Sequence, residues 1–152
     1  MSLTDSNGDL VVRELPSGHQ RTLTNCAEEQ GVGSCFADYT ALSPDSRFIA
    51  YGWFNHEQGE LRVISRTGGQ PRTIYRNEDR THEVHPFGWS PDGKSVLAVR
   101  LRNDSTGDLM WIPVNGEPSR LVKHFARDEK RFGASTGSVD PSPDGRSVAY
   151  DV

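Results

Sequence analysis

Short runs of hydrophobic and β-branched residues recur along the chain, and turns rich in Gly, Pro and Asp separate them. Typical runs are RFIAY at residues 47–51, SVLAV at 95–99 and LMWI at 109–112. None has the 3.6-residue spacing of an amphipathic helix, and turn residues return about every 8 to 12 positions. The pattern predicts an all-β protein built from short strands.

Three short motifs recur in phase with these runs. Ser-Pro-Asp begins at positions 43, 90 and 142, Gly-acid-Leu at 8, 59 and 107, and Arg followed by two apolar or β-branched residues at 21, 72 and 120. The period of about 50 residues is typical of propeller blades and solenoid repeats. Each period holds four predicted strands: one before Ser-Pro-Asp, one after it, one after the Gly-acid pair and one at the Arg.

The Ser-Pro-Asp motif predicts a hairpin turn between the first and second strands of each repeat. Pro presets φ near the value that a type I turn needs, Asp accepts hydrogen bonds from nearby backbone N–H groups, and a following Gly takes the left-handed conformation. Ser46 replaces that Gly in the first copy, which predicts a more strained or differently shaped turn. A structural role, with no part in catalysis, is expected for Pro44, Asp45, Pro91, Asp92, Gly93, Pro143, Asp144 and Gly145.

These motifs resemble the TolB-type (WD-like) β-propeller repeat. WSPDGKSVLAV at 89–99, followed by GDLMWIPV and GEPSRLV, carries the resemblance, and RTLT at 21–24 is similar to the last element of the repeat. Leu42 and Pro141 depart from the pattern, because the repeat has Trp at those positions. The resemblance covers nearly the whole chain and implies a β-propeller.

The phase of the motifs divides the chain into about three blades. We expect a half-blade at about 8–25, blades at about 37–76 and 84–123, and a half-blade at about 136–152. Propellers usually close with four to eight blades. The chain is therefore expected either to be a fragment of a longer bacterial propeller protein or to form a six-bladed homodimer, two copies joining head to tail.

Charge and hydropathy exclude some classes of partner. Lys plus Arg number 17 against 21 Asp plus Glu, for a net charge of −4, which argues against a nucleic-acid surface. No apolar run is long enough to span a membrane, and no signal peptide is recognisable in this chain. Cys26 and Cys35 either form a disulfide or remain two unlinked thiols. A bridge would suit a periplasmic or secreted protein, where repeats of this type are common.

His82 and His85 are weak candidates for metal ligands. They precede the predicted inner strand of the middle blade, but their spacing places them on opposite faces of a regular strand, so joint ligation would need a turn. Polar residues without a metal are the favoured interpretation, and no cofactor is predicted. Oligogalacturonate lyases resemble this repeat and hold a metal through channel histidines, which implies a polysaccharide lyase as the enzyme alternative.

Three other kinds of motif suggest a function that the neighbouring residues do not support. GASTG at 133–137 spells G-x-S-x-G, yet strand and turn residues follow where a nucleophile elbow needs a helix. The segments 5–9 and 103–108 faintly resemble calcium loops but lack the full ligand spacing, so hairpin turns are expected there. The charged stretch 125–132 is expected to be a solvated loop between blades, and a partner contact is the alternative.

These observations favour a non-catalytic scaffold for protein–protein interaction, with a partner that the sequence does not identify. The resemblance carries this expectation, since fold alone does not dictate function. Two enzyme-related alternatives remain: a metal-dependent polysaccharide lyase, and the accessory propeller of a prolyl-oligopeptidase-like peptidase.

Overall fold

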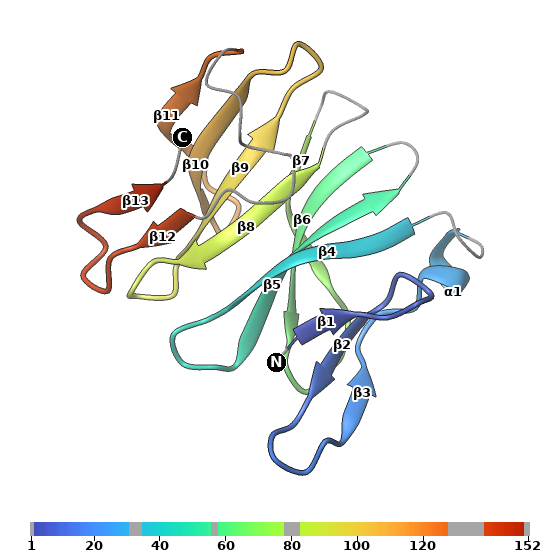
Figure 1. Ribbon diagram of the computed structural model, residues 1–152. Helices are drawn as coiled ribbons and strands as arrows, with labels where there is room; N and C mark the ends of the chain where they lie inside the picture. The colour runs from blue at the N-terminus through green and yellow to red at the C-terminus, as the bar shows by residue number, and fades with distance from the viewer. Residues whose placement is uncertain (1, 31–34, 56–57, 78–82, 128–138, 151–152) are drawn as a thin grey trace.

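The computed structural model describes residues 2–30, 35–55, 58–77, 83–127 and 139–150 of the chain. Antiparallel sheets made of short strands lie side by side in it, as Figure 1 shows. The predicted all-β fold is confirmed, and the arrangement is that of successive blades in a β-propeller. Within the described residues, no helix has the length and hydrophobicity that a bilayer crossing requires.

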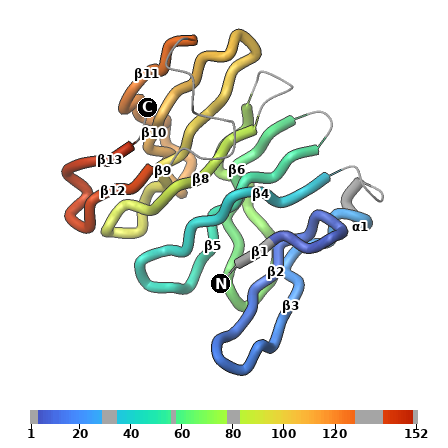
Figure 2. The backbone as a smooth tube through the Cα atoms, viewed as in Figure 1, coloured from blue at the N-terminus to red at the C-terminus, as the bar shows by residue number. Residues whose placement is uncertain are grey.

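Two of the sheets are four-stranded meanders. The first contains β4 (Cys35–Leu42), β5 (Phe48–Asn55), β6 (Gln58–Ser65) and β7 (Arg72–Arg76), and the second contains β8 (Val84–Trp89), β9 (Ser95–Leu101), β10 (Gly107–Pro113) and β11 (Arg120–Phe125). The backbone repeats the same path from one sheet to the next (Figure 2). The first strands of the two sheets, β4 and β8, contact each other, so they are the inner strands of their blades.

Smaller sheets flank this pair. The N-terminal sheet contains β1 (Ser2–Thr4), β2 (Leu10–Arg13) and β3 (Gln20–Thr22), and the C-terminal sheet contains β12 (Val139–Pro141) and β13 (Val148–Tyr150). β12 contacts β8 and thereby continues the row of inner strands. The sequence does not predict β1, because three residues are too few for a periodic signal; the strand forms by pairing with β2.

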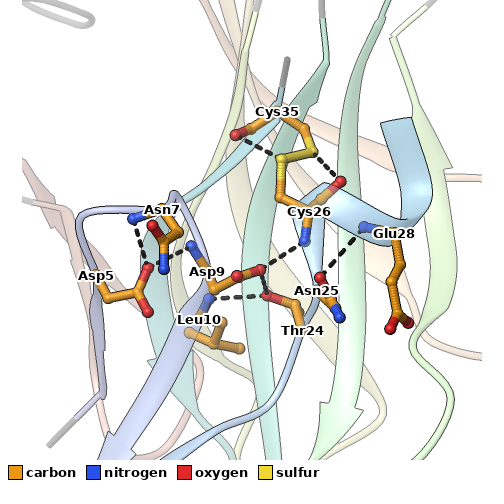
Figure 3. Close-up of a disulfide and its surroundings, with 9 residues drawn as sticks. All are labelled: Asp5, Asn7, Asp9, Leu10, Thr24, Asn25, Cys26, Glu28 and Cys35. Atoms are coloured by element: carbon orange, nitrogen blue, oxygen red, sulfur yellow. Dashed lines mark hydrogen bonds between the residues drawn. A yellow bond between two sulfur atoms is a disulfide. The ribbon is translucent and has the colours of Figure 1, made fainter. Parts of the chain in front are cut away.

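A five-residue helix, α1 (Cys26–Gln30), follows the N-terminal sheet and is also absent from the sequence-based expectation. Asn25 caps it, since its Oδ1 accepts the N–H of Glu28 at 3.2 Å. A disulfide joins Cys26 to Cys35, with Cα atoms 5.7 Å apart, and so links α1 to the start of β4 (Figure 3).

The hydrophobic core lies between adjacent sheets. Leu10, Val12, Ile49 and Trp53 pack between the N-terminal sheet and the β4–β7 sheet. A second cluster, which includes Trp89, fills the space between the two four-stranded sheets, and a third packs the β8–β11 sheet against β12 and β13. Because every cluster needs two sheets, each blade depends on its neighbours for burial of its faces.

Each Ser-Pro-Asp motif forms a compact hydrogen-bonded turn. In the first copy the Ser43 hydroxyl donates to Asp45 at 2.7 Å and accepts the N–H of Phe48 at 2.9 Å, while Asp45 also accepts the N–H of Arg47 at 3.1 Å. The fourth position has positive φ in all copies, 58° at Ser46, 68° at Gly93 and 69° at Gly145. The hydroxyl and backbone hydrogen bonds hold the pKa of the exposed Asp45, Asp92 and Asp144 carboxyls below the usual value.

The acid of each Gly-acid-Leu motif is buried and is held by donors from neighbouring segments of the chain. Asp9 accepts the Thr24 hydroxyl at 2.9 Å and the Cys26 N–H at 2.7 Å, which ties β2 to the start of α1 (Figure 3). The equivalent acids are Glu60 and Asp108. Glu60 is held by Arg62, Thr73 and Arg76, and Asp108 by Arg100, Arg102 and His124. The repeated acid thus joins the third strand to its neighbours.

Candidate functional site

The candidates that the sequence suggests fall in different places. His85 lies in β8, whereas His82, the G-x-S-x-G segment 133–137 and residues 128–132 lie outside the described residues. In the two faint calcium loops, Asp5 accepts the N–H groups of Asn7 and Asp9, and Asp104 accepts the N–H and hydroxyl of Thr106. The carboxylates of Asp5 and Asp104 therefore accept the local hydrogen bonds that are usual in turns.

The structure surrounds His85 with two carboxylates. Its Nε2 lies 2.6 Å from Glu83 Oε2, and one oxygen of Asp38, on β4, completes a group whose ligand atoms all lie within 4.8 Å of one another. We call Asp38, Glu83 and His85 the inner-strand cluster. Sequence reasoning identified only His85, because contact with Asp38 depends on how two separate sheets pack.

The repeat explains why Asp38 and His85 meet. Each stands five residues before the Ser of its own Ser-Pro-Asp motif, at Ser43 and Ser90, so they occupy equivalent positions in neighbouring inner strands. Adjacent blades place equivalent inner-strand residues next to one another. This shared offset is the signal by which the sequence could have paired them.

Gly52 lets the backbones come close at this point. It pairs with Asp38 in the β4–β5 ladder. A Cβ at position 52 would lie 2.8 Å from the carbonyl oxygen of Val84 and 2.9 Å from that of Asp38. These distances are shorter than real Cβ contacts, so a side chain would push β8 away from β4. Glycine is needed here because three strands approach one another.

Tyr39 covers the cluster from β4. It is the extra residue at a β-bulge between Asp38 and Thr40, with φ 44°, an unusual conformation for a residue with a large side chain. Its ring stacks on His85, with centroids 4.1 Å apart and planes inclined by 20°. Burial raises the pKa of Tyr39, and the carboxylates of Asp38 and Glu83 raise it further, which reflects the negative potential around the cluster.

The chemistry open to this group is that of a cation site. Imidazole and carboxylate donors suit divalent transition metals such as Zn²⁺. The space among the lining residues is too small for a water molecule, so it admits no organic ligand. His85 is 3% exposed, while the side chain of Glu83 is 35% exposed, so the cluster reaches solvent through Glu83.

A second feature is a groove between the N-terminal sheet and the β4–β7 sheet. Equivalent residues show its origin: Trp89 and Leu42 each precede a Ser-Pro-Asp motif. Trp89 is 8% exposed and its Nε1 donates to the carbonyl of Ala41 at 2.9 Å, because β4 lies beside it. Leu42 is 51% exposed, because among the described residues the N-terminal sheet has no inner strand to lie beside it.

The groove beside Leu42 has a volume of about 510 Å³. Its lining is Val12, Arg13, Glu14, Leu15, Thr40, Leu42, Ile49 and Arg66. Leu15 is also largely exposed there. We call it the inter-sheet groove. Its lining combines apolar side chains with the charged side chains of Arg13, Glu14 and Arg66.

Comparison with known proteins identifies the fold. No protein-family model and no curated protein matches the chain. Among solved structures, the chain is similar to a putative TolB from Agrobacterium tumefaciens, with TM-score 0.68 and 22% identity over 96% of this chain and 47% of that one. It is also similar to TolB from Acinetobacter baumannii, with TM-score 0.63 and 15% identity over 93% of this chain and 31% of that one.

A prolyl endopeptidase is similar as well, with TM-score 0.66 and 19% identity over 93% of this chain and 22% of that one. The chain spans less than half the length of each of these structures. Together they show a TolB-like β-propeller fold that corresponds to part of each longer protein.

Proposed function

We propose that this TolB-like β-propeller chain is a non-catalytic scaffold for protein–protein interaction, and that a second copy binds in the inter-sheet groove. The observation that supports the proposal is the contrast between Leu42 and Trp89. Equivalent apolar positions are buried where an inner strand lies beside them and exposed where none does among the described residues. Exposed apolar surface of this kind is a binding surface for a partner.

The occupant that fits this surface is the β12–β13 hairpin of the second copy. β12 is an inner strand, the one kind of strand that the described N-terminal sheet lacks, and the described part of the C-terminal sheet consists of two strands. In the repeat, β13 is equivalent to β1, since both are second strands. The hairpin would therefore replace β1 beside β2 and place β12 next to Leu42. Three blades from each copy would then form a six-bladed ring with twofold symmetry.

Solution mass tests the proposal directly. Light scattering after size-exclusion chromatography, over a concentration series, should give about 34 kDa, twice the 16.9 kDa chain. Leu42→Arg should return the mass to that of the monomer, because it places a charge where the inner strand would pack. Leu121→Arg is the matched control: Leu121 is 56% exposed on β11, away from the groove, and its variant should keep the dimer mass. A mass of 16.9 kDa at every concentration would contradict a second copy as the partner.

The neighbours also favour a second candidate function. A prolyl endopeptidase shares the fold, so the chain could serve as the propeller of a peptidase. That candidate requires a hydrolase domain in the same gene, and sequencing the gene beyond the codon for Val152 decides it. An open reading frame that ends there would contradict this second function.

We also propose a periplasmic or secreted location. The Cys26–Cys35 disulfide supports it, because such bonds persist in oxidising compartments and are rare in the cytosol. When the protein is alkylated in intact cells and then analysed by mass spectrometry, both cysteines should remain unalkylated, because the disulfide protects them. Alkylation of both thiols without prior reduction would contradict the location.

A further inference from the structure

We propose that the inner-strand cluster of Asp38, Glu83 and His85 binds a divalent transition-metal ion between two adjacent blades. The inference goes beyond the scaffold role and does not depend on it. The cluster joins one imidazole and two carboxylates from two sheets, and their ligand atoms lie within 4.8 Å of one another. Donors of a tetrahedral Zn²⁺ site are about 3.4 Å apart, given bonds near 2.1 Å. Small side-chain movements would therefore bring all three donors into coordination.

The two carboxylates of the cluster suit a cation. Asp38 and Glu83 bring two negative charges to the end of the inner strands. Asp38 also accepts the N–H of Tyr39 at 2.8 Å. A bound dication would complement both carboxylates, and the neutral imidazole is the form of histidine that binds metal.

The donor set favours a transition metal over Ca²⁺ or Mg²⁺. Ca²⁺ takes six to eight oxygen ligands, and Mg²⁺ prefers oxygen in octahedral geometry. A buried imidazole nitrogen suits Zn²⁺, Co²⁺ or Ni²⁺ instead. His85 is held in place by the Tyr39 ring, which limits its rotation, and Glu83 reaches solvent. Three protein ligands leave one coordination position, and because the enclosed space has no room for water, a fourth ligand would have to approach from the solvent side of Glu83.

The competing interpretation is that His85 and Glu83 form a hydrogen-bonded pair in which Asp38 takes no part. The two interpretations differ in what Asp38→Asn does. Asn keeps the size of the side chain and can still accept the Tyr39 N–H. If His85 and Glu83 form only a hydrogen-bonded pair, Asp38→Asn should have no effect on metal binding. If the cluster is a metal site, Asp38→Asn removes one of its three ligands and should weaken metal binding.

Titration of the full chain with Zn²⁺ by calorimetry, and with Co²⁺ by visible absorption, tests the site. The wild type should bind one equivalent, and the Co²⁺ bands should report nitrogen and oxygen donors. Asp38→Asn, Glu83→Gln and His85→Gln should each weaken binding by about 100-fold or more. Glu83 is 35% exposed, so its substitution should not affect folding even if that of the buried His85 does.

Two matched controls remove the same groups elsewhere. His19→Gln and Asp140→Asn alter an exposed histidine and an exposed acid outside the cluster, and both should bind Zn²⁺ as the wild type does. Leu42→Arg should also retain the metal, so failure of the dimer and failure of the site are distinguishable. Absence of saturable Zn²⁺ binding up to millimolar concentration would overturn the proposal. Equal affinity in Asp38→Asn and the wild type would overturn it as well.

Discussion

Asp108 should make the stability of the protein depend strongly on pH in acid. This buried acid of the second complete blade accepts hydrogen bonds from His124 and Arg102, each at 2.7 Å, and from Arg100. Burial acts to raise its pKa, but the three donors outweigh burial and lower the pKa to about 2 from the usual 3.8. The ionised carboxylate is therefore favoured in the folded state.

The sign and size of the effect follow from linkage. Because the folded pKa is lowered, the contribution is complete above the unfolded value of 3.8 and is lost as the pH falls towards about 2. A difference of nearly two pKa units corresponds to about 2 kcal/mol of unfolding free energy. Asp108→Asn should lose that pH dependence and also lower stability at pH 7, by about 3 kcal/mol, because Arg100 and Arg102 lose their charged partner.

Urea unfolding of wild type and variant at pH 7, 5, 4, 3 and 2, followed by circular dichroism, measures the effect. The wild type should lose about 2 kcal/mol more than Asp108→Asn between pH 5 and pH 2. Asp140→Asn, which alters an exposed carboxylate on β12, is the control and should follow the wild type. Parallel pH curves for wild type and Asp108→Asn would refute the reasoning, because the three donors would then have no net effect on the carboxylate.

Three further changes probe the blades. Trp89→Ala should cost about 3 to 5 kcal/mol in urea unfolding, because it empties a buried site and removes the Nε1 bond to Ala41; a loss below 1 kcal/mol would show that the two sheets are not coupled there. Ser46→Gly should stabilise the protein by about 0.5 to 1 kcal/mol in the same assay, since Ser46 has φ 58° where the other copies have Gly, and a destabilised variant would contradict this account of the turn. Reduction of the Cys26–Cys35 bond, or Cys26→Ser with Cys35→Ser, should cost about 2 to 3 kcal/mol, and an unchanged unfolding midpoint under reducing conditions would count against it.

The fold could be predicted from sequence because its determinants repeat and are local. Ser43, Asp45 and Phe48 make their hydrogen bonds within six residues, so the same letters form the same turn in every copy. Once the turns are in phase with the β-forming runs, four strands per period follow. The packing of one sheet on the next then follows from the apolar faces that each strand must bury.

The candidate site could be predicted only in part, because its geometry depends on contacts between sheets. His85 stands out in the sequence as a polar residue beside an inner strand, but Asp38 is 47 positions away. Their meeting depends on Gly52 and on the bulge at Tyr39, which set how closely β4 approaches β8. The sequence does not predict β1 or α1 for a similar reason, because each element is too short to form without the partner that it contacts.

The bulge at Tyr39 also separates the two candidate surfaces. In the β4–β5 register, Asp38 pairs with Gly52, Thr40 with Tyr51 and Leu42 with Ile49. Side chains alternate between faces along a strand, so the residues opposite Tyr51 and Ile49 share one face and the residue opposite Gly52 lies on the other. Leu42 therefore points to the inter-sheet groove and Asp38 to β8. A strand bound in the groove and a metal in the inner-strand cluster would thus act on opposite faces of β4, so substitutions at the two surfaces should have independent effects on mass and on metal affinity.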